Sequence, residues 1–215
     1  MRISAGMKIK NSKRPLTVFG SVGGVVYDNE LPVILTCFHC VHVNGMEWSE
    51  TSPKTDNDVN FMGEKESAGG TIIRCLRDSY IDAAIIDPGN GNIADIQIAD
   101  WGQLNGIAYP DELTSGSTWL RKIGASTCET YGIYYGIVEE LGVPYPGENK
   151  PHIFKNLLKV RNPGKTKFAK KGDSGSFVLT GDNRLVGMIV MIDHTYTYLI
   201  QAGSIQFNLN IKFSL

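Results

Sequence analysis

The feature that most limits the folds open to this chain is a succession of short apolar runs separated by turn residues. The runs are rich in β-branched and aromatic residues, and Gly, Pro, Asn and Asp lie between them. Runs of this length and spacing indicate strands rather than helices. The predicted strands cover residues 16–18, 22–27, 33–36, 70–74, 83–86, 119–123, 132–139, 157–160, 176–179, 185–191 and 196–201. This pattern is typical of an all-β sandwich or pair of barrels.

Two polar stretches, residues 44–67 and 87–113, are expected to be long loops. The second is expected to close a first half, residues 1–113, and lead into a second half, residues 114–215. The last stretch, residues 204–213, has an apolar residue at every second position, and this alternation favours a strand.

The charge balance argues against nucleic acid and anionic membranes as partners. Lys and Arg number 21 against 22 Asp and Glu, which gives a net charge of -1. The local basic group, Lys165, Lys167, Lys170 and Lys171, is expected to be solvated surface. Apolar runs stay well short of the roughly 20 residues that a membrane helix needs.

The four cysteines are Cys37, Cys40, Cys75 and Cys128. The first two form a C-x-x-C pair, which could be a redox pair or half of a zinc site completed by a histidine. With no second C-x-x-C, we expect no metal and no cofactor. The first residues do not resemble a signal peptide, and the cysteines do not suggest a disulfide framework, so a reduced, intracellular location is expected.

Three segments carry residues suited to nucleophilic catalysis. His39 follows an apolar strand, Asp82 opens another, and Ser174 lies in the sequence G-D-S-G. Each motif alone is ambiguous, because an isolated histidine or a turn aspartate is common. Their order along the chain, His then Asp then Ser, is one of the known arrangements of a catalytic triad.

These segments resemble the histidine, aspartate and serine blocks of the chymotrypsin-like serine peptidases, the PA clan. A fourth block, K-I-G-A-S-T-C-E-T-Y-G-I at residues 122–133, is also similar to a segment of that family. The resemblance spans residues 16–200. It implies two six-stranded Greek-key β-barrels with the active site in the cleft between them, and a serine endopeptidase that acts on protein or peptide substrates. It also implies a C-terminal helix, against the alternation of residues 204–213.

The resemblance assigns a role to each site residue. Ser174 would be the nucleophile, His39 its general base, and Asp82 the partner that orients the imidazole. A serine hydroxyl needs such a base, and imidazole titrates near neutral pH. The backbone N–H groups of Gly172 and Ser174 would form the oxyanion hole.

The chain departs from the family at a disulfide and at an activation site. Cys40 stands where one half-cystine is usual, but its partner position falls near Gly23 and Gly24. In secreted relatives the counterpart of Asp173 binds an N-terminus released by cleavage. Because the sequence has no recognisable activation site, local donors are expected to hold Asp173 instead.

The primary specificity pocket is predicted from the family's spacing. Phe168 would lie at its base, and the wall would be Val190, Met191 and Ile192, with His194 as a further candidate. Phe168 offers no carboxylate, so cleavage after an uncharged or acidic residue is expected rather than after Arg or Lys.

Two alternatives remain open at this stage. The chain could be a pseudo-protease that uses the same fold as a binding module. It could also be the processing protease of a larger protein, controlled by a partner protein or a flanking domain. Esterases are disfavoured because the G-x-S-x-G elbow is absent.

Overall fold

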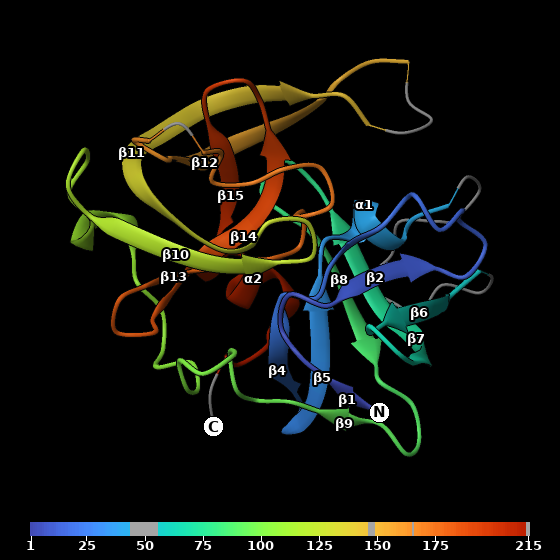
Figure 1. Ribbon diagram of the computed structural model, residues 1–215. Coiled ribbons are helices and arrows are strands. Elements are labelled where there is room, and N and C mark those ends of the chain that lie inside the picture. The colour runs from blue at the N-terminus through green and yellow to red at the C-terminus, as the bar shows by residue number, and fades with distance from the viewer. Residues whose placement is uncertain (44–55, 146–148, 165, 214–215) are drawn as a thin grey trace.

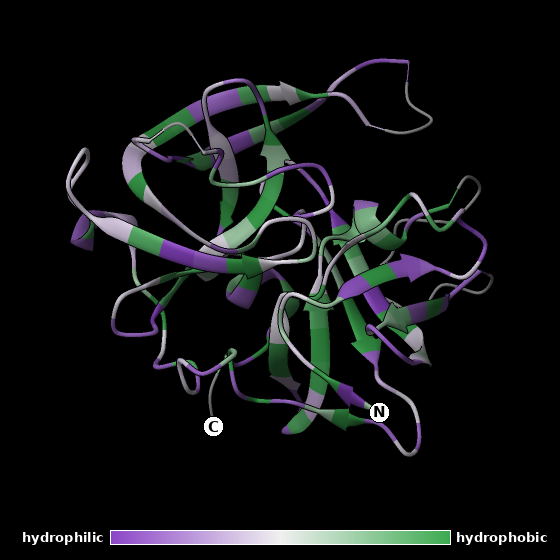
Figure 2. Cartoon of the chain, in the orientation of Figure 1, coloured by the Kyte–Doolittle hydropathy of each residue, from purple (hydrophilic) through white to green (hydrophobic). Residues whose placement is uncertain are grey.

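The computed structural model describes residues 1–43, 56–145, 149–164 and 166–213. Its strands form two curled sheets, one from each half of the chain (Figure 1). None of the helices in these residues has the length and apolarity that crossing a membrane requires. Figure 2 shows apolar residues along the central strands of both sheets and polar residues in many connecting loops.

The first sheet has seven strands in the order β3-β2-β6-β7-β8-β5-β4. These strands are β2 (Lys8–Asn11), β3 (Gly20–Ser21), β4 (Gly24–Asp28), β5 (Leu31–Thr36), β6 (Asp58–Met62), β7 (Ser67–Arg77) and β8 (Asp82–Asp87). The two edge strands, β3 and β4, are consecutive in the chain. Between them, the N–H of Val22 donates to Met7 at 2.8 Å and the N–H of Gly23 donates to Leu35 at 2.9 Å. The edges are therefore joined through one interrupted strand, and the sheet curls into a barrel.

The second sheet is a closed six-stranded barrel in the order β10-β11-β12-β15-β14-β13. Its strands are β10 (Trp119–Gly124), β11 (Cys128–Val143), β12 (His152–Arg161), β13 (Phe177–Thr180), β14 (Leu185–Ile192) and β15 (Thr197–Gln201). All its neighbouring strands run antiparallel. The predicted all-β, double-barrel architecture is confirmed.

The segments outside the barrels are short. They comprise β1 (Arg2–Ile3), paired in parallel with β9 (Ile93–Ala94), together with α1 (Phe38–Val41), the 3-10 helix η1 (Pro110–Glu112) and α2 (Ala202–Leu209). After α2 the chain returns to the first barrel. The N–H of Lys212 donates to Tyr27 at 2.9 Å, the N–H of Tyr27 donates back at 2.8 Å, and Arg74 donates to the carbonyl of Leu209 at 2.8 Å.

Two local predictions were wrong, and the structure decides a third that the sequence left open between strand and helix. Residues 16–18 form no strand, because Val18 donates its N–H to Pro15 in a turn and Leu16 is exposed. The expected loop at 44–67 contains β6; its part at residues 44–55 lies outside the described residues. The alternating C-terminal segment is mostly the helix α2, as the family resemblance implied.

Candidate active site

His39 stands at the end of the first barrel that faces the second. Strand β5 ends at Thr36, and the chain turns at Cys37 into the single turn α1. The histidine side chain keeps 19% of its surface exposed, whereas its neighbours in α1 are buried. The imidazole is therefore fixed by a packed turn and still open to solvent on one side.

Asp82 is the first residue of β8 and its carboxylate is fully buried. One oxygen, Oδ1, accepts the backbone N–H of His39 at 3.0 Å, and the other, Oδ2, lies 2.7 Å from His39 Nδ1. Oδ2 also accepts the hydroxyl of Tyr145 at 2.5 Å. The carboxylate holds the ring in one orientation and leaves Nε2 as the nitrogen available to a substrate or nucleophile.

Burial and charge act against each other at this pair. Burial raises the pKa of Asp82, but the charge and hydrogen bonds of His39 and the Tyr145 hydroxyl lower it below its ordinary value. For His39, burial lowers the pKa, yet the negative charges of Cys40 and Asp82 raise it well above 6.5. Burial also raises the pKa of Tyr145 well above 10, so its hydroxyl remains a donor.

Ser174 lies in the loop before β13, on the second barrel, and is tied to the first barrel. Its carbonyl accepts the N–H of Ser21 at 2.7 Å and the thiol of Cys40 at 3.3 Å. Within the described residues, Ser174 Oγ and His39 share no hydrogen bond; ligand-free sites often hold this contact loosely. The structure thus brings the three predicted residues to one junction between the barrels.

The loop before Ser174 turns at Gly172. Its φ is +99°, a conformation that favours glycine, and a Cβ there would lie 2.3 Å from Ser126 Oγ. The carbonyl of Gly172 turns back to accept Ser21 Oγ at 2.8 Å. Across the described parts of the chain, the N–H groups of Gly172 and Ser174 donate to no protein acceptor.

Asp173 is held by an internal cation that the sequence did not reveal as its partner. The Nζ of Lys122, in β10, lies 3.3 Å from Asp173 Oδ2, and both side chains are fully buried. The carboxylate also accepts the N–H groups of Ser126 and Lys170, each at 2.8 Å, and both donors of Thr127. The expectation that local donors fix this loop is confirmed.

A cavity of about 630 Å³ opens beside Ser174. Four of the predicted pocket residues line it, namely Val190, Met191, Ile192 and His194, and so do Lys167, Ala169, Lys170, Lys171 and Asp193. Asp193 is turned to its own loop, where it accepts two backbone N–H groups and the hydroxyl of Tyr198. Three lysines and one aspartate line the cavity, so the formal charge of its lining is positive.

Phe168 differs from its expected place. Its side chain is buried in the core of the second barrel and borders a separate cavity of about 500 Å³. A Cβ on Gly132 would lie 2.8 Å from its ring, so the ring fills the space over that glycine. Its neighbour Ala169, and not Phe168, lines the cavity beside Ser174.

All four cysteines are free thiols. The residue opposite the Cys40 sulfur is Gly20, and not Gly23 or Gly24 as expected, because a Cβ on Gly20 would lie 2.2 Å from it. Cys37 donates to the carbonyl of Ile189 at 3.1 Å. Cys40 is thus a buried free thiol where the resemblance implied a half-cystine.

No family model matches the chain, and no curated protein matches its sequence. Solved structures that resemble it include the Nocardiopsis protease NAPase, with a TM-score of 0.68, 15% identity and full coverage of both chains. Cellulomonas bogoriensis chymotrypsin has a TM-score of 0.68 and 16% identity over 100% of this chain and 99% of that one. A glutamic-acid-specific serine protease with a substrate-binding histidine triad has a TM-score of 0.64 and 12% identity, covering 99% of this chain and all of its own.

These likenesses span the whole length of the chain at low identity. They establish the fold, which is that of the chymotrypsin-like serine proteases. What the site can do chemically depends on the side chains described above.

Proposed function

We propose that this protein is a serine endopeptidase that hydrolyses peptide bonds through an acyl-enzyme on Ser174. The observation that carries the proposal is the buried Asp82–His39 pair facing the Ser174 loop, beside two unpaired backbone N–H groups. His39 Nε2 takes the proton of Ser174 Oγ as the oxygen attacks the carbonyl carbon. The same proton then goes to the leaving amine.

Two features support stabilisation of the tetrahedral intermediate. The free N–H groups of Gly172 and Ser174 meet the developing oxyanion, and one such donor typically contributes about 3–4 kcal/mol. The buried ion pair of Asp173 with Lys122 fixes the loop between them, so no released N-terminus is required. Water then hydrolyses the acyl-enzyme with His39 as the base.

The experiment is reaction with a fluorophosphonate probe, which labels an activated serine. The wild-type protein should be labelled, and Ser174→Ala should not be. Ser176→Ala is the matched control, since Ser176 is two residues away and fully buried. If the wild type is not labelled, the same fold serves as a binding module instead.

The cavity beside Ser174 supports substrates with an acidic or uncharged residue before the cleaved bond. The apolar wall from Val190 to Ile192 suits an aliphatic stem, and Lys170, Lys171 and His194 suit a terminal carboxylate or amide. A buried cation from Arg or Lys would find no free carboxylate there, because Asp193 is already paired.

A peptide-library cleavage profile tests this specificity. Lys170→Gln and Lys171→Gln should shift the profile from acidic toward uncharged residues, whereas the control Lys155→Gln, in β12 and off the cavity wall, should not. A profile dominated by Arg or Lys would contradict the assignment.

A further inference from the structure

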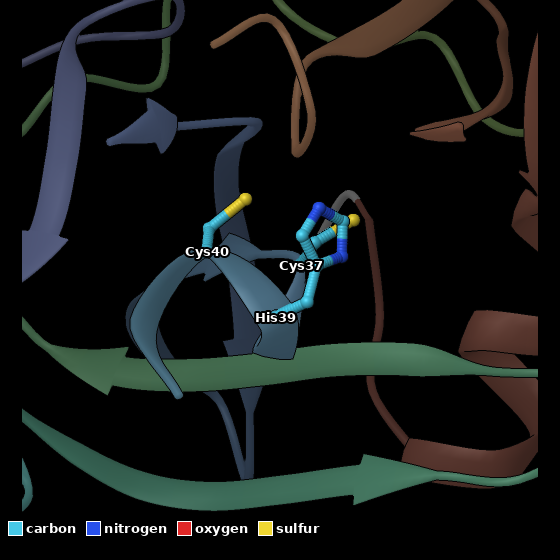
Figure 3. A group of neighbouring side chains, drawn as sticks. All are labelled: Cys37, His39 and Cys40. Atoms are coloured by element: carbon cyan, nitrogen blue, oxygen red, sulfur yellow. The ribbon is translucent and has the colours of Figure 1, made fainter. Parts of the chain in front are cut away.

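The catalytic histidine lies between two thiols in sequence and in space. Cys37, His39 and Cys40 each offer one ligand atom, and these three atoms lie within 4.8 Å of one another. Figure 3 shows the three side chains rising from the same side of α1 and its N-terminal end. Both cysteines are buried, whereas His39 remains partly exposed, which leaves a route from solvent.

The donor set suits a thiophilic divalent cation. Zn²⁺ takes thiolate sulfur at about 2.3 Å and imidazole nitrogen at about 2.0 Å in tetrahedral sites. Ligands on one such ion lie roughly 3.5–3.7 Å apart, so closure requires movements of about 1 Å. Cys37 donates to the carbonyl of Ile189 and Cys40 to that of Ser174, and such weak bonds are readily given up. Cys40 also has side-chain hydrogen bonds with Cys37 and His39, so the three side chains already contact one another.

The surroundings of His39 are also those of a metal ligand. Its Nδ1 lies 2.7 Å from the buried carboxylate of Asp82, so Nε2 is the nitrogen that does not face the carboxylate. Histidine ligands of metals characteristically pair their other nitrogen with a carboxylate, which fixes the ring and increases its basicity. The contact that orients His39 as a base therefore also orients it as a ligand.

We propose that Cys37, His39 and Cys40 form a binding site for Zn²⁺ or a similar soft cation that inhibits the peptidase. Each sulfur that carries a proton releases it to solvent as the two Zn–S bonds form, and the Nε2 lone pair forms the third bond. Water occupies the fourth position. Bound in this way, Nε2 cannot accept the proton of Ser174. The inhibition rests on the proposed function, but the binding does not.

Binding is tested in the full chain carrying Ser174→Ala, with Co²⁺ as the probe in a thiol-free reductant. Thiolate ligation gives sulfur-to-cobalt charge-transfer absorption, and we expect one Co²⁺ per chain, displaced by Zn²⁺. Cys37→Ser and Cys40→Ser should each abolish or strongly reduce this absorption. The control Cys128→Ser, an exposed thiol, should retain it.

A second pair of variants leaves both thiols in place. Loss of an outer carboxylate partner typically weakens metal binding about 10–100-fold, so Asp82→Asn should do so and His39→Gln should weaken it at least as much. Circular dichroism checks that each variant is folded. An absent charge-transfer band in the parent, or one unchanged in both cysteine variants, would overturn the site.

Inhibition is measured separately on the active protein, as the ratio of activities with and without Zn²⁺. The wild type and Cys128→Ser should lose activity on adding Zn²⁺ and regain it with a chelator. Cys40→Ser should lose a much smaller fraction of its own activity. Undiminished wild-type activity with bound Zn²⁺ would overturn the inhibitory role, while cobalt binding to a chain without peptidase activity would refute only the proposed function.

Discussion

Replacing Lys122 by methionine removes the cation of the ion pair with Asp173, together with its hydrogen bonds to Thr127 Oγ1 and to the carbonyl of Cys128. The substitution keeps a long apolar side chain but leaves the fully buried Asp173 without its cation. Removing one partner of a buried pair typically costs about 3–5 kcal/mol. Because Asp173 keeps donors from Ser126, Thr127 and Lys170, the lower end applies, about 3 kcal/mol. For a chain of this size that corresponds to a decrease in Tm of roughly 6–12 °C.

Thermal unfolding measures the loss of stability, and peptide hydrolysis measures the effect on the loop before Ser174. We expect kcat/KM to fall by up to about 10²-fold, the effect of misplacing one oxyanion donor. Lys155→Met is the control, since its ion pair with Glu140 is largely exposed and contributes at most about 1 kcal/mol. In an Asp173→Asn background, Lys122→Met should lower the free energy of unfolding by less than about half of what it does in the wild type. Equal costs in both backgrounds would refute the coupling.

Three further predictions concern the triad. Ser174→Ala and His39→Ala should each remove nearly all peptide hydrolysis, and the double variant should be little less active than either. Near-additive losses in kcat/KM would show that the two residues do not act as one catalytic unit. His39 must be neutral to act as a base, and its pKa is raised. The acidic limb of the pH profile of kcat/KM, recorded with a chelator present, should therefore lie above pH 6.5. A limb at or below that value would contradict the raised pKa. Tyr145→Phe removes a donor to the Asp82 carboxylate and should lower the free energy of unfolding in urea by about 1.5–3 kcal/mol, a loss that would be near zero if the bond were unimportant.

The three candidate catalytic residues could be located in the sequence because each lies in a short segment with its own signal. His39 and Asp82 flank apolar strands, and Ser174 is enclosed by glycines. Their supporting residues carry no such signal. Tyr145 lies beyond the end of β11, and Lys122 occupies a strand position where lysine usually faces solvent; only the folded barrels bring them to Asp82 and Asp173.

The C-terminal segment shows why periodicity alone misled. A segment with apolar residues at every second position also has apolar residues four positions apart. Residues four apart lie on the same face of a helix, so the same sequence can form an apolar helix face. In α2 the residues Ala202, Ile205 and Leu209 face the core at helical spacing, while Phe207 is 85% exposed. Packing against the barrels selects the helix, and Asn210 ends it with φ of +49°.

The return of the chain to the first barrel after α2 has a kinetic consequence. Lys212 pairs with Tyr27, and Phe213 packs against Phe177 of the second barrel, so the last segment bridges the two halves. Contacts between such distant parts of a sequence must wait for loop closure and slow folding. The barrel that holds His39 and Asp82 therefore gains its final contacts only when the last segment, which follows the Ser174 half in the chain, packs against it. This order couples the folding of the part of the chain that carries His39 and Asp82 to that of the part that carries Ser174.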